Sequence, residues 1–283
     1  MLTALFKERF FSFYGLDWGA EVYIQYRRGI MKNKLLNYLN HRNAPLPKGP
    51  WMMYQRWENL LCMHIPADAA KLISHIPKEL ELDLYGGEAW ISIFPFKVNK
   101  LQLRGLPRFP YFHEFLELNV RTYVKYKNVP GIYFFSLDAE KIMPVIGARL
   151  GTLPYYKAKM NAEEINGWTE YYSRRQLQRG KKPYFKGRYR PVSKQELSIS
   201  GTLDYWLFER YYLFNTVRGN IVSVGIHHLP WKPAKAAVTY ETDALNSLLP
   251  GEITGETIKA YYVESLDVLF WPPEIIRETK KDS

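Results

Sequence analysis

The stretch Glu117-Leu118-Asn119-Val120-Arg121-Thr122-Tyr123-Val124 carries the most information about this chain. In a β-strand, successive side chains point to opposite faces. Its odd positions then place an acid, an amide, a guanidinium and a phenol on one face, whereas its even positions are apolar or threonine. A polar row beside an apolar row predicts a strand that packs one face into a core and lines a ligand pocket with the other.

The composition predicts a folded protein of the cytoplasm. The chain has 283 residues, of which 47% are hydrophobic and 16% aromatic, so disorder is not expected. Cys62 is the one cysteine, which excludes an intramolecular disulfide framework and a cysteine-based zinc site and fits a reducing compartment. The chain has no apolar run of the roughly 20 residues that span a bilayer, and its N-terminus lacks the pattern of a signal peptide.

The first 48 residues are predicted to be a helical, basic N-terminal extension. They contain eight basic and three acidic residues, a net charge of +5, and residues 32–40 have a helical pattern. The proline-rich stretch 43–50 then ends any helix, so we predict a main domain over residues 49–283. On this reading Met31 is a candidate for the physiological start.

A second basic region lies between residues 174 and 194, with nine basic residues and no acidic one. Such a region attracts nucleic acid or another anionic surface, or it is simply a solvated hairpin. The solvated hairpin is the more common situation, and no recognisable nucleic-acid-binding motif accompanies the charges. Nucleic acid is therefore the less favoured partner.

The remaining pattern consists of short strands joined by turns, with few helices. Helices are predicted from Asp68 to about residue 75, from Asp138 to about residue 149, and over residues 203–209. The strand pattern lacks regular βαβ alternation, so we predict a β-dominated α+β fold, closed or partly closed into a barrel. The predicted strands are 82–85, 89–97, 111–126, 132–136, 153–160, 168–173, 184–189, 196–200, 210–217, 221–227, 238–241 and 260–264.

The order of several motifs supports a resemblance to a known family. The stretch 117–124 is followed by residues 131–139, by Leu153-Pro154-Tyr155-Tyr156-Lys157-Ala158, and late in the chain by Trp206-Leu207-Phe208-Glu209-Arg210-Tyr211 and His228-Leu229-Pro230-Trp231. Over about residues 51–272, the chain resembles the YqjF family, also called DUF2071. That family is similar to the acetoacetate decarboxylase-like superfamily, which implies a β-barrel enclosing an internal pocket.

The resemblance implies the pocket but not the parent chemistry. Acetoacetate decarboxylase uses a Gly-aromatic-Pro-Lys-Lys motif, in which the first lysine forms a Schiff base. The counterpart here is residues 151–156, where Tyr155 and Tyr156 stand in place of both lysines, and a phenol cannot form an imine. Lys157 is the remaining candidate nucleophile, because it falls on the same face of a strand as Tyr155, displaced by roughly 7 Å.

The candidate site centres on the polar row. Glu117 is the candidate acid or base, because it opens the strand equivalent to that of the decarboxylase's pocket glutamate. Arg121 is suited to binding a carboxylate. The alternative is a structural polar network, although Glu117 and Arg121, four residues apart on a strand, lie roughly 13 Å apart along the backbone, too far for an easy ion pair. The other candidate ligand-binding residues are Asn119, Tyr123, Tyr155 and Arg104.

Three functions remain open from the sequence. The first is a protein that binds a small anionic organic molecule in an internal pocket, without imine chemistry. The second is a lyase-type enzyme, such as a decarboxylase, that acts on a keto acid. The third is a basic adaptor for nucleic acid or an anionic surface. The six histidines do not form a metal-binding motif, so neither a metal nor a cofactor is expected.

Overall fold

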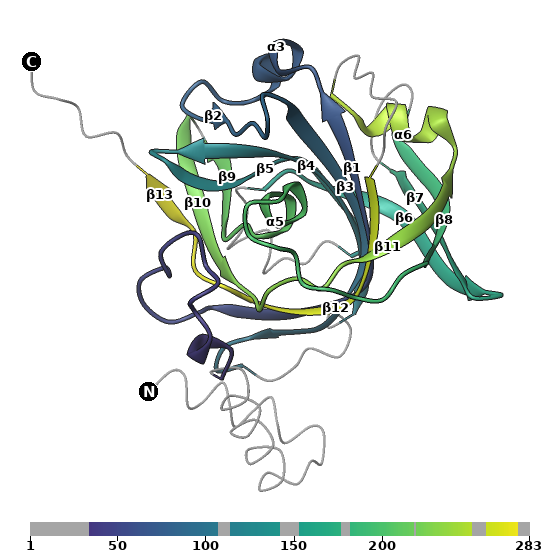
Figure 1. The fold of residues 1–283 in the computed structure, drawn as a ribbon, viewed down its shortest axis with the longest axis horizontal. Helices are drawn as coiled ribbons and strands as arrows, with labels where there is room; N and C mark the ends of the chain where they lie inside the picture. The colour runs from purple at the N-terminus through teal and green to yellow at the C-terminus, as the bar shows by residue number, and fades with distance from the viewer. Residues whose placement is uncertain are drawn as a thin grey trace, which may run out of the picture. The chain divides into compact units, whose positions relative to one another are not determined.

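The computed structural model describes residues 34–106, 114–141, 153–176, 182–217, 219–250 and 259–276. The chain divides into two compact units, residues 1–40 and residues 41–283. The element described in the first unit is a short 3-10 helix, η1 (Lys34–Asn37). All other described elements belong to the second unit, whose strands form a 13-stranded sheet within the described residues (Figure 1).

A wall of antiparallel strands in the order β12–β1–β3–β4–β5 organises the second unit. These strands are long, and most of their residues are buried. The polar row identified in the sequence lies on β4, in the interior of the wall. The bounds of the wall strands are β1 (Met53–Ala67), β3 (Ala89–Leu103), β4 (Phe115–Tyr126), β5 (Val129–Ala139) and β12 (Lys259–Phe270).

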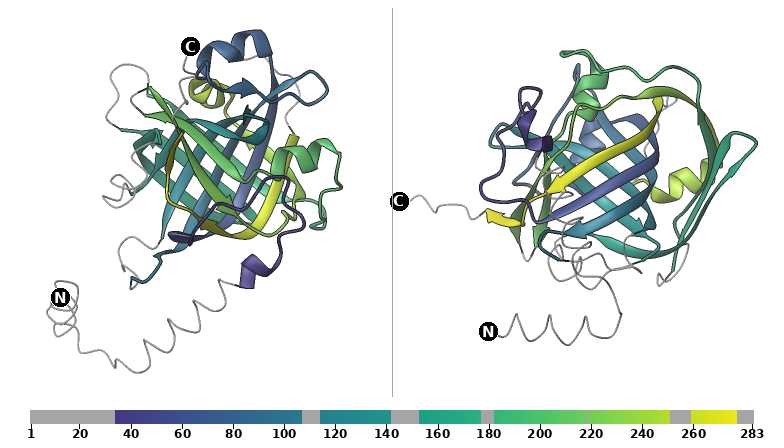
Figure 2. Two further views of the ribbon diagram at one scale, coloured as in Figure 1. Left: turned by 90° about the vertical axis from the view of Figure 1, so that its left-hand side faces the viewer. Right: turned by 90° about the horizontal axis from the view of Figure 1, so that it is seen from below.

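On one side the wall closes into a circuit that we name ring A. Strand β9 (Tyr212–Val217) runs parallel to β5, and β10 (Asn220–His227) pairs with both β9 and β12. The short helix α5 (Leu203–Phe208) lies within the outline of ring A in the view of Figure 1, and the turned views of Figure 2 place it at one end of the ring. Leu207 and Phe208 of this helix are fully buried, so α5 plugs the ring.

On the other side the same wall closes into a second circuit, ring B. Strand β6 (Tyr155–Ile165) runs parallel to β5, and β7 (Trp168–Arg175), β8 (Tyr184–Pro191) and β11 (Ala234–Tyr240) continue the sheet back to β12. Helix α6 (Thr242–Leu248) contributes to the core of ring B. The other elements are α3 (Ala69–Leu72), η2 (Ile73–His75), β2 (Glu81–Leu82) beside β4, and β13 (Glu274–Ile276) beside β10.

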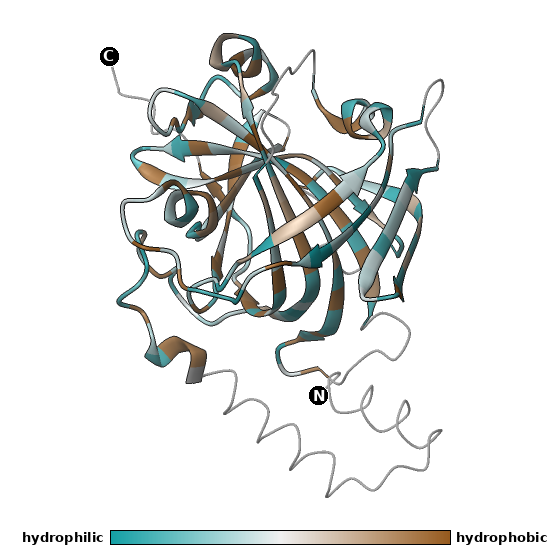
Figure 3. Cartoon of the chain, turned by 45° about the vertical axis from the view of Figure 1, so that its right-hand side comes forward, coloured by the Kyte–Doolittle hydropathy of each residue, from teal (hydrophilic) through white to brown (hydrophobic). Residues whose placement is uncertain are grey.

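The alternation of side chains along the wall produces two separate cores. On β4, Leu118 and Val120 pack into the core of ring B with aromatic residues of β7 and β8. Tyr123, on the opposite face, belongs to the core of ring A, together with Trp57 and Phe94. Figure 3 shows hydrophobic and hydrophilic residues alternating along these strands. Because side chains alternate between the two faces of a strand, one set of strands supplies core residues to both rings.

The described residues 41–47 pack against β10. The Arg42 guanidinium donates to the main-chain carbonyl of Ile226 at 2.9 Å, and Nε2 of His41 lies 2.8 Å from the carbonyl of His228. Gly225 is required at this contact, because a Cβ there would lie 2.0 Å from the ring of Pro47. The predicted boundary of the N-terminal extension, at residue 48, stays a prediction.

The predicted fold class is confirmed: the described residues form a β-dominated α+β fold with few helices. The Asp68 carboxylate caps its predicted helix by accepting from the amide of Ala70 at 2.8 Å. Two local predictions are wrong. Asp138 does not begin a helix but lies within β5, where a buried ion pair and a parallel partner strand hold it extended; residues 142–149 of that predicted helix lie outside the described residues. Residues 196–200 form no strand.

Candidate functional site

Ring A encloses a small cavity of about 30 Å³. Wall strands β1, β4 and β5 line one part of it, and residues from α5 onward line another. Most of the lining is apolar and aromatic, with a minority of polar side chains, which is the usual composition of a ligand site. The polar lining residues are Gln55, Glu117, Asn119, Arg121, Tyr155, Arg210 and His228.

Glu117 points into this cavity from β4 and is 4% exposed. Its backbone is fixed from the other side of the wall, because the Tyr171 hydroxyl in ring B donates to the Glu117 carbonyl at 2.9 Å. Burial raises the pKa of the Glu117 carboxyl to about 8, although a hydrogen bond with Asn119 opposes this shift. The carboxyl is therefore mostly protonated at neutral pH.

Arg121 is 4% exposed and faces the same cavity. It forms no ion pair with any described residue, so no bridge to Glu117 exists. Its guanidinium lies 3.8 Å from the centroid of the Phe94 ring, an attractive contact for a cation. Burial lowers the pKa of Arg121, and the nearby positive charge of Arg210 lowers it further, whereas Tyr123 opposes the shift.

Arg210, just after α5, supplies a second guanidinium. It donates to the Asp83 carboxylate at 2.5 Å, and Lys125 contacts the other oxygen of that carboxylate at 2.8 Å. Its Nε donates to the main-chain carbonyl of Trp206 at 2.8 Å, which anchors the guanidinium to the helix. Because Asp83 is shared between two cations, it offsets the charge of Arg210 only in part.

Tyr123 does not line the cavity but lies behind Arg121 in a buried polar cluster. The Tyr123 and Ser92 hydroxyls are 2.6 Å apart, and Ser92 lies 2.7 Å from Nδ1 of His64. Burial lowers the pKa of His64 well below its usual value, so the ring is neutral. The cluster therefore adds no positive charge behind Arg121.

Four buried polar atoms of the cavity residues have no hydrogen-bond partner among the described residues. They are Oε2 of Glu117, Oδ1 of Asn119, Nε of Arg121 and Nη2 of Arg210. A buried polar group without a partner costs about 1–3 kcal/mol, so unsatisfied atoms are rare in folded proteins. Four of them around one cavity, with both donors and acceptors, indicate a place for a polar molecule.

Of the other candidate residues, the structure places Tyr155 at the cavity and Lys157 and Arg104 away from it. Tyr155 lines the cavity, whereas Tyr156 is 37% exposed and stacks with Arg175 of ring B. The Lys157 ammonium donates to the main-chain carbonyl of Glu140 and does not line the cavity. Arg104 also lies away from it, 5.2 Å from the Trp51 ring.

Three polar lining residues were not predicted from the sequence: Gln55, Arg210 and His228. Arg210 and His228 lie in motifs that carried the family resemblance, but their spacing gave no sign of a shared cavity. Burial lowers the pKa of His228 to about 4, so this ring is also neutral. The Gln55 amide is held near Trp57, whose indole N–H donates to it at 2.7 Å.

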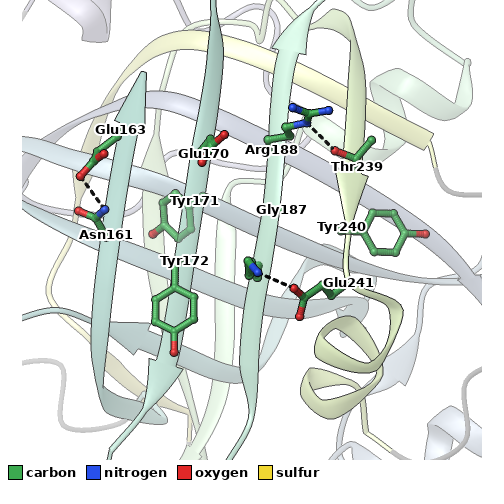
Figure 4. Close-up of a pocket in the computed structure, with 11 residues that line it drawn as sticks. Asn161, Glu163, Glu170, Tyr171, Tyr172, Gly187, Arg188, Thr239, Tyr240 and Glu241 are labelled. Atoms are coloured by element: carbon green, nitrogen blue, oxygen red, sulfur yellow. Dashed lines mark hydrogen bonds and ion pairs between the residues drawn. The ribbon is translucent and has the colours of Figure 1, made fainter. Parts of the chain in front are cut away.

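The structure also has two larger depressions, of about 570 and 580 Å³. The first lies on the outer face of β6, β7, β8 and β11, where Figure 4 shows its side chains. It carries acids beside the basic residues of the segment 174–194; for example, Lys186 forms an ion pair with Glu241 at 2.7 Å. This face is therefore mixed in charge, and residues 177–181 of the basic segment lie outside the described residues.

The second depression is lined by Tyr171 and Tyr189 and by charged residues at its rim, among them Lys97 and Glu114, which pair at 2.5 Å. Neither depression contains the unpartnered buried atoms that distinguish the ring A cavity. Within the described residues, no group of three or more histidine, cysteine, aspartate or glutamate side chains could hold a metal ion. None of the described helices is both long and apolar enough to span a membrane.

Comparison with known proteins agrees with this architecture. The sequence profile of DUF2071, described as an uncharacterized conserved protein, matches residues 54–260. The chain belongs to the DUF2071 family. The uncharacterized protein YqjF of Bacillus subtilis (strain 168) is 42% identical to this DUF2071 chain over 236 residues, which cover 82% of the chain and 95% of YqjF.

Solved structures similar to this DUF2071 protein show the fold. The enduracididine biosynthesis enzyme MppR complexed with pyruvate has a TM-score of 0.54 and 11% identity, covering 83% of this chain and 94% of MppR. An acetoacetate decarboxylase-like enzyme from Sphingomonas wittichii RW1 has a TM-score of 0.53 and 12% identity, covering 81% and 94% of the two chains. The expected likeness in fold to acetoacetate decarboxylase-like enzymes is thereby confirmed.

Proposed function

We propose that the ring A cavity binds a small organic carboxylate, and that 2-oxo acids are the chemical class it takes. The observation that carries this proposal is the set of four unpartnered polar atoms around one cavity. Two of them are guanidinium nitrogens, and the other two belong to a carboxyl and an amide. A ligand with a carboxylate at one end and a carbonyl beside it offers acceptors to the two guanidinium nitrogens and to the protonated Oε2 of Glu117.

The charges of the cavity favour an anion. Arg121 has no acidic partner among the described residues, and its guanidinium is close enough to Arg210 for the two charges to repel each other. A carboxylate bound between them replaces this repulsion with two attractive contacts, and guanidinium groups match carboxylates in geometry. Glu117, being neutral at pH 7, does not repel the ligand.

The rest of the cavity suits a carbonyl group. A protonated Glu117 carboxyl and the Tyr155 phenol are both donors, and a carbonyl oxygen accepts from either. The likeness in fold to MppR, whose solved complex contains pyruvate, supports a 2-oxo acid. With a tyrosine at position 155 and Lys157 bonded elsewhere, the cavity supports binding without an imine.

The size of the cavity limits the ligand. A volume of about 30 Å³ has room for roughly two water molecules. Even a three-carbon acid therefore requires the lining side chains to move when it enters, and a drug-sized molecule is excluded. We expect pyruvate and acetate to bind more tightly than longer acids.

Thermal unfolding with added ligand tests this proposal. A ligand that binds only the folded state adds about 2.7 kcal/mol of stability when present at a hundredfold excess over its Kd. We expect pyruvate to raise Tm in the wild type and to have no effect on Arg121→Met. Acetamide, which has the size of acetate but no charge, should have no effect on either protein.

Arg188→Met is the matched control, because it removes an arginine from the exposed outer face of β8. This variant should respond to pyruvate as the wild type does. An equal response to acetate and acetamide would contradict the anion site. An unchanged response in Arg121→Met would show that the carboxylate binds elsewhere.

A further inference from the structure

We propose that Glu117 exchanges a proton with the carbon atom next to the carbonyl of a bound 2-oxo acid, so that the cavity catalyses enolisation. This inference rests on the proposed function of the same site. It adds a reaction to what is otherwise a binding pocket. The geometry that carries it is a carboxyl group, two guanidinium groups and a phenol facing one small cavity.

Glu117 is the one carboxylic acid among the described residues that line this cavity. Its Oε2 has no hydrogen-bond partner among them, so this oxygen is available to a reacting atom. Its main chain is held by the pairing of β4 with β3 and β5 and by the Tyr171 hydroxyl. A fixed carboxyl with a free oxygen is what a general base requires.

The protonation state of Glu117 suits both directions of the transfer. With a pKa of about 8, roughly a tenth of the carboxyl groups are ionised at pH 7. The ionised form accepts a proton, and the protonated form returns one. General acids and bases are most effective when their pKa lies near the working pH.

The step is balanced without any further reagent. The ionised Oε2 takes a proton from C3 of pyruvate, the C3–H bond breaks, and its electron pair forms the C2–C3 double bond. The electron pair of the carbonyl moves onto O2, which becomes an enolate oxygen. The Arg121 and Arg210 guanidinium groups and the Tyr155 phenol stabilise that charge, and the reverse step restores the keto acid.

Proton NMR of pyruvate in D₂O measures this exchange directly. The methyl signal decays as deuterium replaces hydrogen at C3. We expect the wild-type protein at saturating pyruvate to accelerate the decay at least about 100-fold over buffer, the lower range for general acid–base catalysis. At pyruvate concentrations well below saturation, the rate should rise with pH up to about 8 and then level off, because the ionised carboxyl of the ligand-free protein is the base.

Glu117→Gln separates binding from exchange. A glutamine amide is neutral and similar in shape to the protonated carboxyl, so pyruvate should still raise Tm, whereas the exchange should fall to the rate in buffer. Glu170→Gln, on the exposed face of β7, is the matched control and should retain full exchange.

The outcomes are distinguishable. If pyruvate binds the wild type without exchange, the enolisation is overturned and the binding function stands. If pyruvate does not bind, the proposed function itself fails. Should Glu117→Gln fold poorly, the pH profile of the wild type decides, since a rate that does not rise between pH 6 and 8 rules out Glu117 as the base. Exchange that persists in a folded Glu117→Gln protein assigns it to another group.

Discussion

The two faces of the wall treat buried charge differently. On the ring B face, Asp138 of β5 meets Arg175 of β7, with 2.7 Å between the carboxylate oxygen and Nε. On the ring A face, Glu117 and Arg121 of β4 are equally buried, yet neither forms an ion pair with a described residue. Asp138 pairs with Leu118, the residue that follows Glu117 in the chain. Because neighbouring residues of a strand point to opposite faces, Glu117 faces ring A and Asp138 faces ring B.

This difference separates a structural role from a functional one. A buried ion pair is costly to desolvate, but removing one member leaves the other charge uncompensated. In the ring B pair Oδ1 of Asp138 accepts from Arg175, whereas Oδ2 has no hydrogen-bond partner among the described residues. A buried charge without a partner destabilises the folded protein, unless a ligand of opposite charge binds to it. We infer that the Asp138–Arg175 pair serves the fold, whereas Glu117 and Arg121 are kept for a ligand. Perturbed groups of this second kind concentrate at functional sites.

Breaking the ring B pair should produce the largest effect. Asp138→Ala leaves Arg175 buried without its partner, and we expect the free energy of unfolding to fall by about 3–5 kcal/mol. Denaturation in urea measures this loss. A second change, Arg175→Met, made in the same protein should recover most of the stability, since it removes the isolated charge. A loss below about 1 kcal/mol in the single variant would mean that the pair is not structural.

The pH dependence of stability sharpens the comparison. The folded pKa of Glu117, about 8, lies above the ordinary value of 4.5, so between these two pH values the folded protein holds a proton that the unfolded chain has released. Stability must therefore fall as pH rises through this window. Between pH 6 and 8 we expect a loss of about 2 kcal/mol from this group, absent in Glu117→Gln.

Unfolding measured at several pH values tests this slope. Burial also raises the pKa of Asp138, but only to about 6, because Arg175 opposes the shift. Measurements above pH 6.5 therefore report mainly on the ring A acid. Parallel pH profiles for the wild type and Glu117→Gln would show that Glu117 titrates normally and would remove the basis for its acid–base role.

The alternating pattern of β4 made half of the site predictable. Glu117, Asn119 and Arg121 lie on one face because a strand alternates, and the structure brings all three to one cavity. Arg210 was not predictable, because its position depends on Asp83, 127 residues away in the chain. The two parallel pairings of β5, with β6 and β9, also join distant segments that no local pattern connects. Asp138 was misassigned for the same reason, since acids often begin helices and its partner Arg175 lies 37 residues later.

Removing the unpaired cation should produce the smallest effect on stability. Arg121→Met replaces a buried charge that lacks an acidic partner by an apolar side chain of similar length, and such replacements are often neutral or stabilising. The loss of its contact with Phe94 offsets part of that gain, so we expect a change in unfolding free energy within about 1 kcal/mol.

The matched variant is Arg175→Met on the ring B face, which leaves Asp138 without its partner and should cost about 3–5 kcal/mol. Urea denaturation of the two variants compares their free energies of unfolding directly, because the substitution is the same and both arginines are buried. Equal losses would mean that Arg121 supports the fold as Arg175 does, and the ring A cavity would then be a structural polar network. A stable Arg121→Met protein that no longer responds to pyruvate would show that this arginine is kept for the ligand.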